Sequence, residues 1–220
     1  CELEEQPEYP DTIPDEIIIT FDKSPTISTT VEPHFPPNLY AYTANMNSGV
    51  QVLNITDPLN PTVLDSLLTD GTSYCTDIDD STLFIANGSA GVGVYSTTPL
   101  RNGNPPEIIS NIEFEDVEIV DVGHIDNYIY ALGDNGFINM IKREGNVFTK
   151  LGEYVFQDID KKTLFDIESA NNRLYAGITD GAQTEFVILQ RVLDHLEPLG
   201  NFTFDAVGTD LHVRTNDAFV

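Results

Sequence analysis

The sequence predicts an all-β protein, a β-propeller of four-stranded antiparallel blades with about 45 residues per repeat. Apolar residues occur in short runs separated by Gly, Pro and other turn formers, which favours many short strands. A motif of Ala, four residues and Gly recurs four times, at offsets of 42, 45 and 45 residues. Each repeat has room for four short strands, and such a unit must stack on its neighbours to bury both faces.

The Ala–Gly motif predicts the central hairpin of each blade. Its copies run from Ala44 to Gly49, Ala86 to Gly91, Ala131 to Gly136 and Ala176 to Gly181. Each Ala ends a short apolar strand, and each Gly precedes another. Because Gly adopts a positive φ without steric cost, we expect the four glycines to shape these turns.

A second recurring mark is an aspartate beside an apolar residue, nine or ten residues before the Ala. It occurs as Asp77, Asp121 and Asp166, and Asp205 begins the next unit. Repetition indicates a structural role, in which each carboxylate accepts hydrogen bonds from a neighbouring turn. The alternative is that paired carboxylates face the central channel and hydrolyse a glycosidic bond.

The chain divides into two parts by composition. Residues 1–36 are acidic and rich in Pro, which predicts an extended tether, although the apolar run at 17–21 could add to a sheet as a strand. Residues 37–220 hold four repeats and the start of a fifth. We expect the first repeat to lack its leading strand, and residues 204–207 to supply that of the fifth. The fifth repeat stops in mid-strand, so we expect the natural protein to continue further.

Charge and residue usage exclude several functions. The net charge of −26 would repel nucleic acid and favours cations or basic partners. Two cysteines, Cys1 and Cys75, make no disulfide framework, and the four His lack metal-ligand spacing. The acidic clusters lack the spacing of a calcium loop, so no cofactor is predicted, with calcium left as the alternative. No nucleophile elbow, zinc-protease or phosphate-loop motif occurs.

The first residues resemble the start of a mature bacterial lipoprotein. Cys1 is followed by Glu2, Leu3, Glu4 and Glu5, and this acidic stretch resembles the export signal of surface lipoproteins in the Bacteroidota. The resemblance implies a lipid on Cys1 and a place on the outer membrane, facing outward. The alternative is a sequence boundary that falls on a Cys by chance.

The first repeat carries the most specific sequence pattern. It reads Gly49-Val50-Gln51-Val52-Leu53-Asn54-Ile55-Thr56-Asp57-Pro58-Leu59-Asn60-Pro61. This resembles the LVIVD repeat, with Asn54 where that family usually has Asp. The later repeats keep progressively less of the pattern. The resemblance implies a β-propeller, often on secreted or surface proteins, and it implies no reaction.

These observations favour a non-catalytic surface lipoprotein that presents its propeller to a protein or a glycan. A protein of the outer membrane is the expected partner, because a short tether keeps the propeller near the bilayer. The alternative is an extracellular hydrolase with carboxylates in the propeller channel.

Overall fold

The computed structural model describes residues 28–31, 38–156, 163–170, 173–179, 182–205, 212–214 and 217–219. The first blade consists of β1 (Ser28–Val31), β2 (Tyr40–Ala44), β3 (Val50–Asn54) and β4 (Thr62–Leu67). The second consists of β5 (Cys75–Asp79), β6 (Thr82–Ala86), β7 (Val92–Ser96) and β8 (Glu107–Ile112). A short 3₁₀ helix, η1 (Thr98–Asn102), connects β7 to β8.

The third blade consists of β9 (Ile119–Ile125), β10 (Tyr128–Gly133), β11 (Phe137–Glu144) and β12 (Val147–Val155). The fourth consists of β13 (Thr163–Ala170), β14 (Arg173–Thr179), β15 (Thr184–Val192) and β16 (His195–Phe204). A two-stranded sheet, β17 (His212–Arg214) and β18 (Asp217–Phe219), follows. Within every sheet, strands that are consecutive in sequence are antiparallel neighbours.

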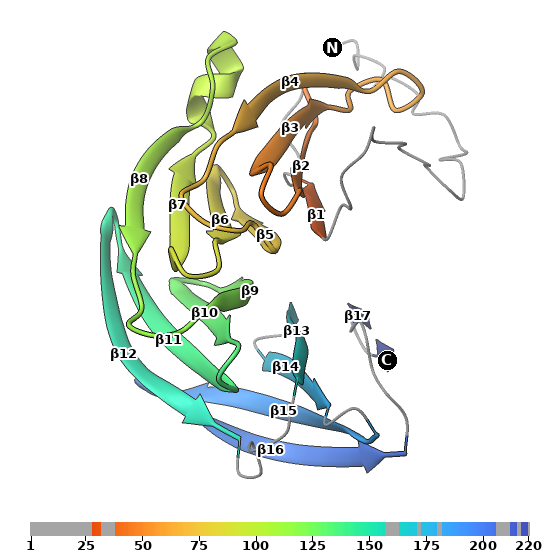
Figure 1. The fold of residues 1–220 in the computed structure, drawn as a ribbon, viewed down its shortest axis with the longest axis vertical. Coiled ribbons are helices and arrows are strands. Elements are labelled where there is room, and N and C mark those ends of the chain that lie inside the picture. The colour runs from red at the N-terminus through yellow and green to blue at the C-terminus, as the bar shows by residue number, and fades with distance from the viewer. Residues whose placement is uncertain are drawn as a thin grey trace, which may run out of the picture.

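The blades follow one another around an arc (Figure 1). The first strands of successive blades contact each other in the order β1, β5, β9, β13 and β17, and so form the inner wall of the arc. The last strands, β4, β8, β12 and β16, lie on the outer side (Figure 1). The prediction of an all-β propeller with four-stranded antiparallel blades is therefore confirmed.

Two strand assignments from the sequence were wrong. The first blade has its leading strand, because β1 pairs with β2 although it lies within the predicted tether. Phe204 does not lead the fifth unit, because it still pairs with Thr184 as the end of β16. Asp205 follows that strand, and residues 206 and 207 lie outside the described part of the chain. The leading strand there is β17, which contacts β13. The apolar run at 17–21 lies outside the described residues.

The turn glycines have the expected backbone conformation. The φ angles of Gly49, Gly91 and Gly136 are 76°, 84° and 85°, whereas Gly181 lies outside the described residues. A Cβ on Gly49 or Gly91 would also lie 2.0 or 2.1 Å from a carbonyl oxygen of the outer strand, that of Leu67 or Ile112. These two glycines are therefore required both for the turn and for the close approach of the outer strand.

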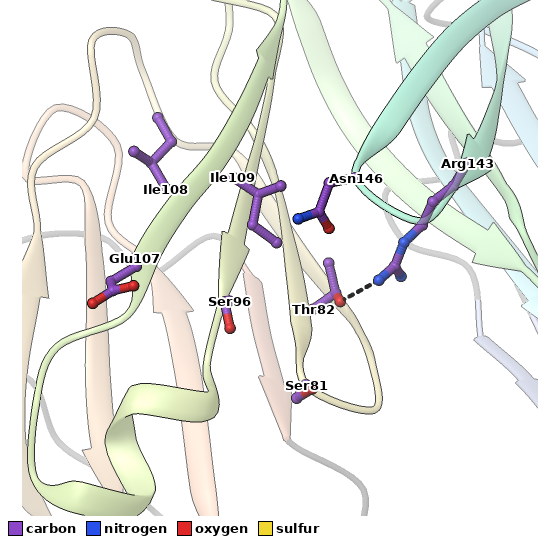
Figure 2. A pocket seen from close by; sticks show the side chains of 8 residues that line it. All are labelled: Ser81, Thr82, Ser96, Glu107, Ile108, Ile109, Arg143 and Asn146. Atoms are coloured by element: carbon purple, nitrogen blue, oxygen red, sulfur yellow. Dashed lines mark hydrogen bonds between the residues drawn. The ribbon is translucent and has the colours of Figure 1, made fainter.

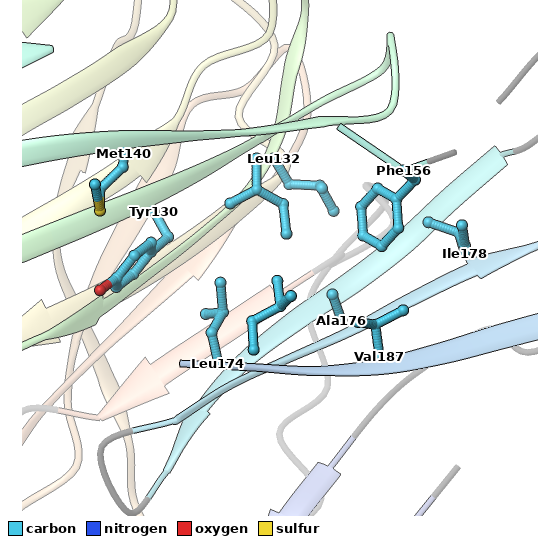
Figure 3. Close-up of a cluster of buried hydrophobic side chains, with 10 residues drawn as sticks. Tyr130, Leu132, Met140, Phe156, Leu174, Ala176, Ile178 and Val187 are labelled. Carbon is cyan, nitrogen blue, oxygen red and sulfur yellow. The ribbon is translucent and has the colours of Figure 1, made fainter. Parts of the chain in front are cut away.

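The hydrophobic core lies between successive blades. Strands β2 and β6 are buried at every position. Strand β6 belongs to the second blade, which packs against the first blade on one face and the third on the other. Figure 3 shows the cluster between the third and fourth blades, in which Tyr130 and Leu132 face Leu174 and Ala176. Similar clusters join the first to the second blade and the second to the third.

Backbone bridges reinforce the same packing. Met46, in the central turn of the first blade, exchanges two hydrogen bonds of 3.0 and 3.1 Å with Ser73, just before the second blade. Gly88, in the central turn of the second blade, exchanges two of 3.0 Å with Ile119. The central turns of the first two blades are thus each fixed to the start of the following repeat.

Candidate functional site

The predicted aspartates do not occupy one repeated position. Asp121 in β9 pairs with Leu132, and Asp166 in β13 pairs with Gly177. Leu132 and Gly177 each directly follow the Ala of the repeated motif. Asp77 in β5 instead stands opposite Phe84, two residues before Ala86. Asp205 follows the outer strand β16 and leads no blade. The prediction of one shared position is therefore confirmed for Asp121 and Asp166 and wrong for Asp77 and Asp205. A similar spacing along the sequence corresponds to different strand registers.

Three of these carboxylates accept hydrogen bonds from other described residues. Asp121 is buried, and its Oδ1 accepts a hydrogen bond of 2.8 Å from the backbone N–H of Val122. Asp77 Oδ1 accepts one of 2.8 Å from the backbone N–H of Ile78. Asp205 accepts one from the side-chain amide of Gln183. For Asp77 and Asp121 the donor is thus the next residue of the same strand. We had expected the donor to come from a neighbouring turn. The side chain of Asp166 lies outside the described part of the structure.

Asp77 also takes part in a charged cluster between the second and third blades. We call Asp77, Asp79, Thr82, His124 and Arg143 the inter-blade cluster. His124 Nδ1, on β9, lies 2.6 Å from Asp77 Oδ2, and His124 Nε2 lies 3.9 Å from Asp79 Oδ1. Arg143, on β11, donates to Asp79 Oδ2 at 3.1 Å and to Thr82 Oγ1 at 2.7 Å. Two side chains of the third blade are thus tied to one hairpin of the second.

The surroundings of His124 favour its charged form. Burial is the largest single influence and lowers the pKa of the imidazole. The hydrogen bond and the negative charge of Asp77, together with the charge of Asp79, outweigh burial and the opposing charge of Arg143. The pKa of His124 is therefore raised above its ordinary value.

This shift predicts a pH-dependent contribution to stability. Because the pKa of His124 is higher in the folded state, its contribution is fully present below the unfolded-state pKa of about 6.5. The contribution is lost as pH rises through the folded-state pKa. We expect His124→Gln to lower the free energy of unfolding more at about pH 5.5 than at about pH 9, as measured by urea denaturation.

The matched control is His195→Gln. His195 is 57% exposed and lies 3.0 Å from Glu197 on the same strand, so it joins no blades. Its substitution should change the free energy of unfolding little at either pH. A cost of His124→Gln that stays constant or grows with pH would show that the ion pair with Asp77 does not stabilise the fold.

Arg143 belongs to a repeated inter-blade contact that we did not predict from the sequence. Arg143 and Arg191 each stand one residue before the end of the third strand of their blade, β11 and β15. The Arg143 guanidinium lies 6.0 Å from the centre of the Phe84 ring in the preceding blade, and that of Arg191 lies 3.9 Å from the ring of Tyr128. Such cation–π contacts stabilise by about 0.5–2 kcal/mol. This contact could have been predicted from the sequence, because the chain has only ten Lys and Arg residues and two of them recur at this position of the repeat.

A polar pocket adjoins the inter-blade cluster. Its volume is about 470 Å³, and it lies between the second blade and the β11–β12 hairpin of the third (Figure 2). Arg143 and Thr82 belong both to its lining and to the cluster. The pocket also adjoins the turn between β5 and β6, at Ser81.

The described residues include no group of three or more His, Cys, Asp or Glu side chains placed to hold a metal ion. Two acidic clusters of the sequence lie in the described part, one at residues 77–80 and one at 113–118. In the first, Asp77 and Asp79 join the inter-blade cluster. Glu118 receives a hydrogen bond of 3.4 Å from the Tyr74 hydroxyl.

Across the described ranges, no helix has the length and apolarity needed to cross a membrane.

Comparison with known proteins gives a likeness of fold. The structure resembles the crystal structure of a protein from Lactobacillus plantarum, with a TM-score of 0.62 and 17% sequence identity. The match covers 74% of this chain and 53% of that protein, so the chain spans about half of its length. The likeness shows the fold alone. No protein-family model matches the chain. A search of curated proteins also finds no match.

Proposed function

We propose that this protein is a non-catalytic surface lipoprotein whose β-propeller binds a protein or a glycan. A lipid on Cys1 holds it to the outer membrane facing outward, and it serves as an accessory subunit of an outer-membrane complex. The Cys1–Glu5 stretch and the LVIVD-like residues 49–61 support this placement. The proposal includes no cofactor and no nucleic acid.

The non-catalytic role is supported best by the contacts of the aspartates on the inner strands β5 and β9. Asp77 and Asp79 bind His124 and Arg143 of the next blade, and Asp121 binds a backbone N–H. A catalytic carboxylate of a hydrolase must reach the substrate, where it transfers a proton or attacks as a nucleophile. Asp77 and Asp79 are instead committed to contacts that hold two blades together, and Asp121 is buried against the backbone of its own strand.

The outer strands offer surface for association. Large apolar side chains are exposed on all four of them, among them Val63 on β4, Ile108 on β8, Val147 on β12 and Phe202 on β16. Contacts with a partner would bury these side chains. The net charge of −26 favours a partner whose contacting surface is basic.

The rival function is an extracellular hydrolase, and the contact between Asp77 and His124 favours it. A carboxylate 2.6 Å from an imidazole is an arrangement that enzymes use for proton transfer. The two functions are distinguished by incubating the purified protein, and its Asp77→Asn variant, with extracellular polysaccharides. We expect no release of reducing ends by either protein. Release by the wild type that is lost in Asp77→Asn would establish the hydrolase.

The anchor is tested separately. We expect mass spectrometry of the N-terminal peptide, prepared from native membranes, to find acyl chains on Cys1. Two or three chains hold a protein firmly on a bilayer, whereas one chain binds only marginally. An unmodified peptide that continues upstream of Cys1 would exclude the anchor.

A further inference from the structure

The pocket beside the inter-blade cluster is built by two blades. The second blade supplies the β5–β6 turn, the end of β7 and the start of β8, and the third supplies the β11–β12 hairpin. Its lining residues are Ser81, Thr82, Ser96, Glu107, Ile108, Ile109, Arg143 and Asn146. A volume of about 470 Å³ lies within the range of about 300–1,000 Å³ typical of small-molecule sites.

The polar groups of this pocket fall into two sets. Arg143 and Thr82 are bonded to each other at 2.7 Å, and Arg143 is also bonded to Asp79, so they form a fixed wall. Ser81, Ser96, Glu107 and Asn146 have side chains with no hydrogen-bond partner among the described residues. Two hydroxyls, a carboxylate and an amide are therefore available to a ligand, and together they both donate and accept.

The charges of the pocket select against an anion. The positive charge of Arg143 is already paired with Asp79 at 3.1 Å. Glu107 adds a negative charge at the other end of the lining from Arg143 (Figure 2). The whole chain carries a net charge of −26. A phosphate or an acidic sugar would meet net repulsion. A neutral ligand with many hydroxyl groups would meet none.

Apolar surface completes the lining. Ile108 is 62% exposed, and Ile109 beside it also lines the pocket (Figure 2). A pyranose ring presents C–H groups on its faces and hydroxyl groups around its edge. Such a ring can pack on isoleucine while its hydroxyls bond to serine, glutamate and asparagine.

We propose that this pocket binds a neutral saccharide, one or two sugar units at a time. The inference rests on the proposed function and specifies its glycan-binding form. It assigns Glu107 and Asn146 as hydrogen-bonding residues from two different blades. Recognition therefore depends on the packing that the inter-blade cluster maintains between those blades.

The test is titration calorimetry of the whole purified protein with maltose, cellobiose, lactose and xylobiose. We expect at least one of these disaccharides to bind. We expect Glu107→Ala and Asn146→Ala each to weaken that binding by roughly three- to tenfold, the loss of one hydrogen bond. Both side chains are exposed, so neither change should impair folding. Digalacturonate, an acidic disaccharide of similar size, should bind at least tenfold more weakly.

Asp194→Ala is the matched control, because Asp194 lies in the corresponding β15–β16 hairpin of the fourth blade and outside the pocket. It should leave saccharide binding unchanged. Absence of binding to all four neutral disaccharides, or binding that both pocket variants retain, would overturn the inference. The proposed function would survive that result if a membrane partner were still found. Cleavage of a bound saccharide would overturn the non-catalytic function and leave the binding inference standing.

Discussion

Replacing Gly91 with alanine is expected to lower the free energy of unfolding by roughly 2–4 kcal/mol. Gly91 has a φ of 84°, which an alanine adopts only with strain. The added Cβ would also lie 2.1 Å from the carbonyl oxygen of Ile112, so the outer strand β8 would have to move away. Urea denaturation followed by circular dichroism measures the loss.

The control for this prediction is Gly103→Ala, after η1. Gly103 has a similar φ of 73°, but a Cβ there would meet nothing within 4 Å. Its cost should therefore be the backbone strain alone, about 1–2 kcal/mol. Equal losses in the two variants would show that the close approach of β8 to the central turn contributes nothing.

Replacing Leu132 with alanine is expected to cost about 2–5 kcal/mol of stability. Leu132 is fully buried and packs with Leu174, Ala176 and Ile178 of the next blade (Figure 3). Removing its outer carbons leaves a cavity between two rigid sheets, which can close only partly. Because the cavity lies between blades, the third and fourth blades should still unfold together in a single transition.

Leu193→Ala removes the same carbons from an exposed position. Leu193 is 78% exposed in the β15–β16 turn, so its loss should change stability by less than about 0.5 kcal/mol. A cost for Leu132→Ala no larger than that of Leu193→Ala would contradict the shared core. The comparison thus separates packing between blades from a general effect of removing leucine carbons.

The period of the repeat made the fold predictable. Ala and Gly recur at offsets of 42 and 45 residues, and Gly49, Gly91 and Gly136 adopt a similar positive φ in the central turns. The strands β1 and β17 were misassigned for an equally physical reason. Both are short, with four residues in β1 and three in β17. Short strands leave too few positions for a recognisable pattern of alternating apolar residues. Composition around β1, dominated by Pro and acidic residues, concealed the β-branched run Thr29–Val31.

The inter-blade cluster could not be derived in the same way. Asp77 resembles Asp121 in spacing, yet the register of β5 against β6 places it opposite a different residue of the hairpin. His124 lies 47 positions away from Asp77 in sequence, and only the stacking of blades brings them together. Spacing along a repeat predicts strands, whereas side-chain pairs between repeats depend on register and twist.

The central claim, a non-catalytic module on an outer-membrane complex, is tested most directly by purifying the native protein from membranes in a mild detergent. We predict that it co-purifies with an outer-membrane protein at a fixed stoichiometry. The Asp77→Asn variant should retain that partner, because the claim assigns Asp77 no chemical step. Recovery of a lone monomer that cleaves a polysaccharide would contradict the claim.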